Sequence, residues 1–172
     1  MNRTPLPPRS KPLKVLGLDL AKLTGIALVS DKGVEFAKEL NFGAYRDKLK
    51  TGHNGHIFLA LFEHISTMLI TIPITHIIYE RAHHRGGAAS RIGVGMCSTV
   101  LCVSAREEVP VLDVHTLTLK KWATENAKAG KNAMIERASA LAGRPIESDN
   151  AADAIMAAAY GLEVLQGQEV TQ

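Results

Sequence analysis

Residues 14–42 contain three short runs whose apolar residues are typical of strands. The runs 14–20 (KVLGLDL) and 24–30 (TGIALVS) are rich in Val, Leu and Ile, and the short turn between them predicts a hairpin. Asp31, Lys32 and Gly33 supply turn chemistry, and residues 34–42 then alternate imperfectly between apolar and charged positions, as an edge strand does. Three antiparallel strands are therefore expected at the start of the fold.

The next segments predict a helix followed by a strand. Residues 56–70 place apolar side chains three and four positions apart, which gives a helix with one apolar face for packing on the sheet. Residues 75–81 (THIIYER) are β-branched and aromatic, as strands are. Because this strand follows a helix directly, we expect a crossover that lays it parallel to the first strand.

The remaining chain favours helices. Residues 88–108 are rich in small side chains, and glycines within a helix usually mark close helix approach, so this segment is a candidate dimer helix. A short buried strand is expected at 109–114, and helices at 117–126 and 131–142. A last helix, capped by Asp149 or Asn150, is expected to run to Leu165.

The expected organisation is a flexible basic, proline-rich arm (1–13), one domain (14–166) and a tail (167–172).

Composition adds limits. With 172 residues, 46% apolar and 22% charged, the chain fits one ordinary folded domain. No run approaches the roughly 20 apolar residues of a membrane span, and no apolar core follows the N-terminal charges, so we expect a cytoplasmic protein with no membrane association. Cys97 and Cys102 lie in an apolar stretch and are expected to be reduced core thiols.

Basic residues are clustered although the net charge is only +3. One cluster lies in the N-terminal arm and a second follows Glu80. A third spans residues 120–144 and contains Lys120, Lys121, Lys128, Lys131, Arg137 and Arg144. Such clusters interleaved with isolated carboxylates suit an anionic polymer held by its phosphates, although solvated surface is the alternative for any one cluster.

Four acids are placed where they can converge. Asp19 ends the first strand and Glu80 ends the strand expected parallel to it, while Asp149 and Asp153 lie one helical turn apart. Carboxylates at one sheet edge are hard oxygen ligands that suit Mg²⁺ or Mn²⁺. Asp149 alone is also a common kind of helix cap, and Asp19 alone an exposed strand end. Asp153, flanked by Ala and Ile, must face a cleft or a costly burial.

The blocks GLDLAKLTGIAL, IIYERAHH, GKNAMIERASAL and DNAADAIMAAAYG, in this order, resemble the RuvC-type Holliday junction resolvases of the ribonuclease H-like superfamily. The resemblance covers most of residues 14–162. It implies an α/β fold with a ribonuclease H-like mixed five-stranded sheet flanked by helices, and a homodimer. It also implies two Mg²⁺ ions per active site, with Mn²⁺ as a substitute, and branched DNA as the partner, above all four-way junctions.

Residue by residue, Asp19, Glu80 and Asp153 match acidic positions of that family. Its fourth position, three residues before the last aspartate, is Asp or His, whereas this chain has Asn150 there. Asp149 is our candidate for the fourth metal ligand and Asn150 the alternative. The resemblance also implies a basic pair near the scissile phosphate, Lys120 and Lys131, with Lys131 in the catalytic set. The expected DNA-binding residues are Arg81, His83, His84, Arg85, Arg91, Lys120, Lys121, Lys128 and Lys131.

The expected reaction is two-metal hydrolysis of a phosphodiester, with Asp19 bridging the ions. Two such sites related by a two-fold axis would nick a four-way junction symmetrically. The alternatives are a flap, fork or ribonuclease activity on the same fold, or a junction-binding protein without catalysis. GLDLAKLTG also resembles the phosphate loop of actin-like ATPases and sugar kinases, but 172 residues leave no room for their two lobes.

Overall fold

The computed structural model describes residues 12–48, 53–81 and 88–169. One mixed sheet runs through this part of the chain in the strand order β3-β2-β1-β4-β5. Its strands are β1 (Lys14–Asp19), β2 (Leu23–Ser30), β3 (Gly33–Asn41), β4 (His76–Glu80) and β5 (Val111–Val114). β2 is antiparallel to β1 and β3, whereas β4 is parallel to β1 and β5. The predicted antiparallel opening, edge strand, parallel crossover and five-stranded mixed sheet are confirmed.

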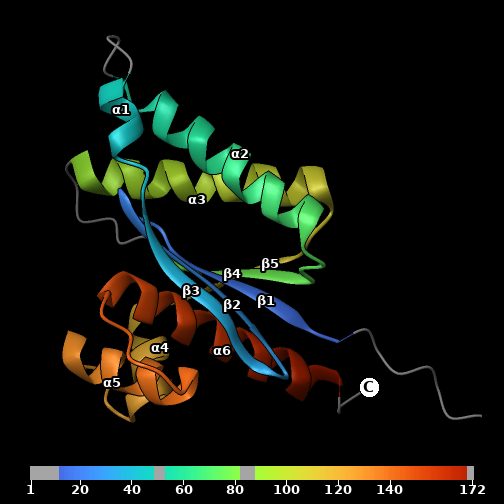
Figure 1. Ribbon diagram of the computed structural model, residues 1–172, viewed down its shortest axis with the longest axis vertical. Coiled ribbons are helices and arrows are strands. Elements are labelled where there is room, and N and C mark those ends of the chain that lie inside the picture. Colours follow the sequence, from blue (N-terminus) through green and yellow to red (C-terminus); the bar gives the residue numbers. More distant parts are fainter. Residues whose placement is uncertain (1–11, 49–52, 82–87, 170–172) are drawn as a thin grey trace, which may run out of the picture.

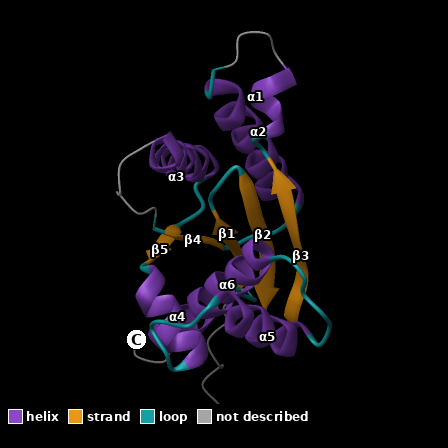
Figure 2. Ribbon diagram, turned by 90° about the vertical axis from the view of Figure 1, so that its left-hand side faces the viewer, coloured by secondary structure: helices purple, strands orange, loops and turns teal. Residues whose placement is uncertain are grey.

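Helices cover both faces of this sheet (Figures 1 and 2). α2 (Gly55–Thr71) and α3 (Ala88–Glu107) lie on one face, and α4 (Thr116–Thr124), α5 (Lys131–Ala142) and α6 (Asp149–Glu169) lie on the other. A short helix, α1 (Ala44–Lys48), follows β3. No helix in the described ranges is both long and apolar enough to cross a membrane.

Strand alternation divides the core into two halves and decides where the strand-end acids point. Leu16 and Leu18 of β1 belong to the core beneath α2 and α3, whereas Val15 belongs to the core beneath α6. Because side chains alternate with a period of two, Asp19 lies on the same face as Val15. Ile78 of β4 also lies on the α6 face, so Glu80 joins Asp19 there.

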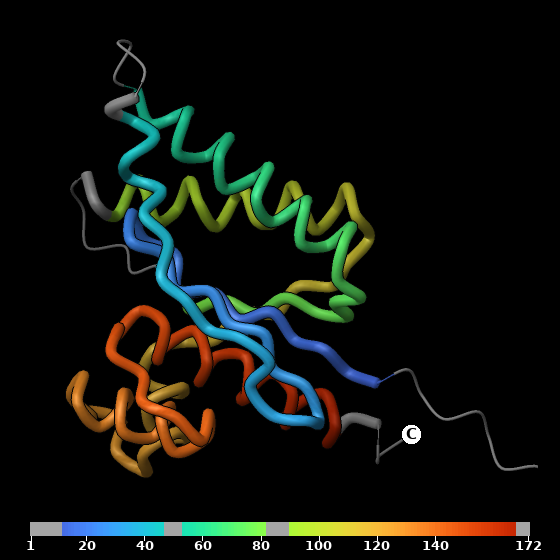
Figure 3. Tube along the Cα trace, in the orientation of Figure 1, coloured from blue at the N-terminus to red at the C-terminus, as the bar shows by residue number. Residues whose placement is uncertain are grey.

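Helix α6 lies directly on the sheet because two strand residues have no side chain. A Cβ atom on Gly17 would collide with the backbone of Ala154 and Ala158, and one on Gly25 would collide with the carbonyl of Asn150. The facing side of α6 is built of alanines that are almost fully buried. Figure 3 shows this helix running antiparallel to β1 and close beneath it. The first turns of α6 therefore lie at the strand end that carries Asp19.

The structure corrects three expectations about the elements. β5 was expected to be buried, but only Val114 is buried and Asp113 is exposed, because β5 is an edge strand. The cap of α6 is Ser148 rather than Asp149 or Asn150, since the Ser148 hydroxyl accepts the Ala151 N–H at 3.2 Å. The helix also continues past Leu165 to Glu169, where we expected a tail.

Two further differences are local. Cys97 is half-buried and Cys102 is exposed, so Cys102 is not a core thiol, because it lies on the outer side of α3. Helix α1 was not expected, since its five residues are too few to show a periodic pattern. Its start is marked by Asn41, whose Oδ1 accepts the Ala44 N–H at 3.1 Å. The expected N-terminal arm lies outside the described residues apart from Pro12 and Leu13.

The contact between α6 and the sheet predicts the effect of adding a single methyl group. We expect Gly25→Ala to destabilise the fold by about 1–3 kcal/mol, because the new Cβ collides with backbone that has no room to move. Gly167→Ala, near the C-terminal end of α6 with nothing within 4 Å of the added Cβ, is the control and should not destabilise. Urea denaturation measures both, and equal stability of the two variants would contradict the prediction.

Candidate functional site

Four acidic side chains from three separate elements gather at one edge of the sheet. Asp19 comes from the end of β1 and Glu80 from the end of β4, two neighbouring parallel strands. Asp149 and Asp153 come from the first two turns of α6. The negative charges of Asp153, Glu80 and Asp149 all act on the Asp19 carboxyl. The structure thus brings together the four acids that the sequence pointed to.

The burial and closeness of these acids raise the pKa values of two of them, Asp19 and Asp153. Burial raises the pKa of Asp19 to about 8, and the neighbouring charges of Asp153, Glu80 and Asp149 add to the effect. Burial, followed by the charge of Glu80, raises the pKa of Asp153 to about 6. Both carboxyls are therefore easier to ionise when positive charge is supplied beside them.

Two lysines supply part of that positive charge. Lys131, the first residue of α5, forms an ion pair with Asp149, and this contact holds the pKa of the Asp149 carboxyl below its ordinary value. The Lys131 charge also lowers the pKa of Asp19, and the Lys120 charge lowers that of Asp153. The two lysines named from the sequence thus lie beside the acids, although only Lys131 pairs directly with one.

Thr116 is a contact that sequence reasoning missed. Its hydroxyl donates to Oε1 of Glu80 at 2.6 Å and holds that carboxylate from the first residue of α4. Thr116 and Lys120 are four residues apart and so lie on one face of α4. A threonine after a strand is too common to signal such a role, and the signal that was available is its spacing to Lys120.

Glu39 of β3 is a second residue that the sequence did not single out. Its Oε2 atom accepts the Ser148 hydroxyl at 2.6 Å and the Asn150 amide Nδ2 at 2.8 Å. Both partners lie at the start of α6, more than 100 residues further along the chain. The first turn of α6 is therefore tied to the outer strand of the sheet as well as to β1 and β2.

The expected DNA-binding residues are distributed unevenly. Arg81 is exposed and pairs with Asp113 of β5, with Nη2 and Oδ2 2.5 Å apart. Arg91 of α3, Lys121 of α4 and Lys128 of the following loop are exposed, and Lys120 is half-buried. His83, His84 and Arg85 lie outside the described residues.

The acids fit a hard divalent cation by the chemistry of their oxygens. No three His, Cys, Asp or Glu side chains in the described ranges already form a metal cage. Nevertheless, a cation bound beside Asp19 and Asp153 would offset the lost hydration and the repulsion that raise their pKa values. If this edge of the sheet takes Mg²⁺ or Mn²⁺, Asp19, Glu80 and Asp153 are the residues that would hold it, with Asp149 and Asn150 next to them.

The raised pKa values predict how stability changes with pH when metal is chelated. The folded state keeps protons on Asp19 and Asp153 that the unfolded chain releases near pH 3.8, so stability should fall as pH rises toward about 8. Asp19→Asn should remove most of this slope and stabilise the protein at pH 8 by about 2 kcal/mol or more.

Denaturation in EDTA at several pH values measures the slope, with Asp31→Asn in the exposed β2–β3 turn as control. If the wild-type protein is no less stable at pH 8 than at pH 5, the electrostatic description of the site is wrong.

Comparisons with known proteins agree with this fold. The sequence matches no family model and no curated protein. Among solved structures, "T. thermophilus RuvC in complex with Holliday junction substrate" superposes with a TM-score of 0.75 at 14% identity, covering 90% of this chain and 96% of that one. "Thermus thermophilus RuvC structure" superposes with a TM-score of 0.72 at 14% identity, covering 90% and 97%. The chain therefore has the ribonuclease H-like fold of RuvC over nearly its whole length.

Proposed function

We propose that this protein is a metal-dependent DNA endonuclease that resolves four-way junctions by paired, symmetric nicks. The observation that carries the proposal is the convergence of Asp19, Glu80 and Asp153 at one sheet edge, with Lys120 and Lys131 beside them. Carboxylates with flanking lysines suit an anionic phosphodiester that is held by positive charge and cut at a metal. The likeness to a RuvC structure that contains a Holliday junction supports the junction as substrate.

The side chains of this site would have separate roles in the reaction. Asp19, Glu80 and Asp153 would hold two Mg²⁺ ions, which when bound supply an activated water and stabilise the leaving 3′ oxygen. Thr116 holds one oxygen of Glu80, and the other oxygen would be its metal ligand. Lys120 and Lys131 would attract the scissile phosphate and offset the carboxylate charge.

Asp149 and Asn150 would have different roles. The Asp149 carboxylate is engaged by Lys131, and its main effect would be to hold that lysine toward the substrate. The Asn150 amide donates through Nδ2 to Glu39, which leaves its carbonyl oxygen for a cation. We therefore propose Asn150 Oδ1 as the fourth metal ligand, in preference to our first candidate Asp149.

A symmetric double nick needs two copies of the site. The layer of α2 and α3 is our candidate interface for a homodimer. Large apolar side chains are exposed on it, with relative exposures of 53% for Leu59, 69% for Ile70 and 49% for Leu101. Covering these side chains with a second copy would remove apolar surface from water.

The first experiment compares cleavage of an immobile four-way junction with matched duplex, flap and RNA–DNA hybrid substrates, in Mg²⁺, Mn²⁺ or EDTA. We expect metal-dependent paired nicks in the junction, reduced at least about 100-fold in Asp19→Asn because a buried carboxylate ligand is lost. Asp31→Asn should cleave as the wild type does.

Preference for flap or hybrid substrates would leave the site intact but replace the proposed substrate. Tight junction binding without any cleavage would mean that the protein is a binding module rather than an enzyme.

The fourth ligand is tested by two further variants. Asn150→Ala should raise the Mg²⁺ concentration needed for half-maximal cleavage about 10-fold or more, because an oxygen ligand is removed. Asp149→Asn should instead lower the rate at saturating Mg²⁺ with little change in the metal requirement, because Lys131 loses its ion pair. The opposite pattern, with the metal requirement raised only in Asp149→Asn, would return the ligand role to Asp149.

A further inference from the structure

Glu39 lies where the outer strand of the sheet meets the start of the last helix. In the β2–β3 ladder, Glu39 pairs with Gly25, the glycine whose missing side chain admits the Asn150 carbonyl. The Glu39 side chain therefore stands beside the first turn of α6. It is exposed to solvent, yet its Oε2 atom accepts two hydrogen bonds, from Ser148 and Asn150.

The bond to Asn150 determines which way the amide faces. A carboxylate only accepts hydrogen bonds, so the group of Asn150 that meets Glu39 must be its NH₂ group. The carbonyl oxygen is then the other end of the amide, the end that can bind a cation. Replacing the Glu39 carboxylate with a group that accepts no hydrogen bond would let the Asn150 amide rotate. Either its NH₂ group or its carbonyl oxygen could then face the cation.

The bond to Ser148 extends the same control to the helix itself. The Ser148 hydroxyl donates to Glu39 and accepts the Ala151 N–H, so its one proton is directed toward β3 and its lone pair toward the helix. This chain of bonds connects β3 with the turn that precedes Asp153. The Glu39 carboxylate is therefore linked, through Ser148, to the turn of α6 that leads to Asp153.

We propose that Glu39 is a positioning residue of the nuclease site, which orients Asn150 and the first turn of α6 so that the oxygen ligands of α6 meet those of β1 and β4. The proposal rests on the proposed function, because it assigns Glu39 a role in assembling that metal site. Glu39 acts through Asn150 and Ser148, and it is not expected to touch the metal or the DNA.

The test compares Glu39→Ala and Glu39→Gln in the full chain. Glu39→Ala should raise the Mg²⁺ concentration for half-maximal cleavage about 10-fold and lower kcat about 10-fold, with KM for the junction within about 2-fold of wild type. Glu39→Gln should stay within about 3-fold of wild type in all three quantities. Both hydrogen bonds end on a single oxygen, Oε2, and a glutamine carbonyl placed there can accept both, although more weakly than a carboxylate does.

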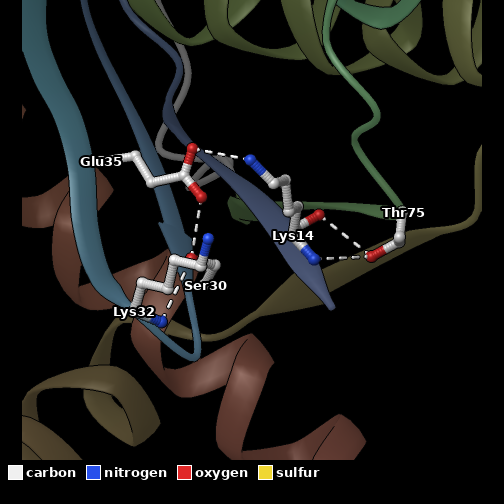
Figure 4. A network of polar contacts seen from close by, with 5 residues as sticks. All are labelled: Lys14, Ser30, Lys32, Glu35 and Thr75. Atoms are coloured by element: carbon white, nitrogen blue, oxygen red, sulfur yellow. Dashed lines mark hydrogen bonds and ion pairs between the residues drawn. The ribbon is translucent and has the colours of Figure 1, made fainter. Parts of the chain in front are cut away.

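Glu35 provides a matched control on the same strand. Its carboxylate accepts the Ser30 hydroxyl at 2.8 Å and pairs with Lys14 at 2.8 Å, at the end of β3 away from the acids (Figure 4). Glu35→Ala therefore removes a comparable network without touching α6. It should lower the melting temperature at least as much as Glu39→Ala does, while kcat and the metal requirement stay at wild-type values.

A double-mutant cycle isolates the contact with Asn150. In an Asn150→Ala background, Glu39→Ala should change the metal requirement less than 3-fold, because the amide that it orients is already gone and only the bond to Ser148 remains to be lost. Additive effects of the two substitutions would overturn the proposal. So would a Glu39→Ala variant that loses thermal stability alone, or a Glu39→Gln variant as impaired as Glu39→Ala.

Mn²⁺ binding, followed by electron paramagnetic resonance without DNA, separates this proposal from the proposed function. If wild type binds Mn²⁺ but cleaves no junction, the proposed function fails while Glu39 can still be judged by metal affinity. Glu39→Ala should then weaken Mn²⁺ binding about 10-fold, and unchanged affinity would overturn the role of Glu39.

Discussion

The direct contact of α6 with β1 and β2 is the constraint on which the rest of the structure depends. It exists because Gly17 and Gly25 present no side chain, so that the helix backbone rests on the strands. This contact brings the first turns of α6 to the end of β1 and so places Asp153 beside Asp19. A larger residue at either glycine would separate the acids of the helix from those of the sheet, whatever the acids themselves were.

Gathering the acids has an electrostatic cost that the fold offsets only in part. The pKa of Asp19 is raised to about 8 because the burial that brings the carboxylates together also removes water from them. Lys120 and Lys131 lower the pKa of the acids that they face, but two lysines do not balance four carboxylates. In the proposed nuclease, this shortage of positive charge is what would attract divalent cations to the site.

Most of the fold and part of the site could be predicted from the sequence, because each depends on local pattern. The alternation in β1 and β4 is enough to put Asp19 and Glu80 on one face, once the strands are known to be parallel and adjacent. The helical spacing of Asp149 and Asp153 is likewise local. Ser148 was missed as the cap because Asp149 and Asn150, which follow it directly, are equally good capping residues. Cys102 was misplaced because a helix rich in small residues gives a weak signal of which side is buried.

The sequence by itself determined the elements other than α1, their order, which residues of each strand share a face, and which acids are candidates for the site. These follow from short-range periodicity and side-chain chemistry. Only the tertiary structure decided which polar groups support those acids. Thr116 meets Glu80 across 36 residues, and Glu39 meets Asn150 across 111. Their side chains resemble many others on exposed strands and helix starts. Packing of the elements decides which of these side chains come within hydrogen-bonding distance and in which direction. The residues next to them in the sequence do not indicate either the distance or the direction.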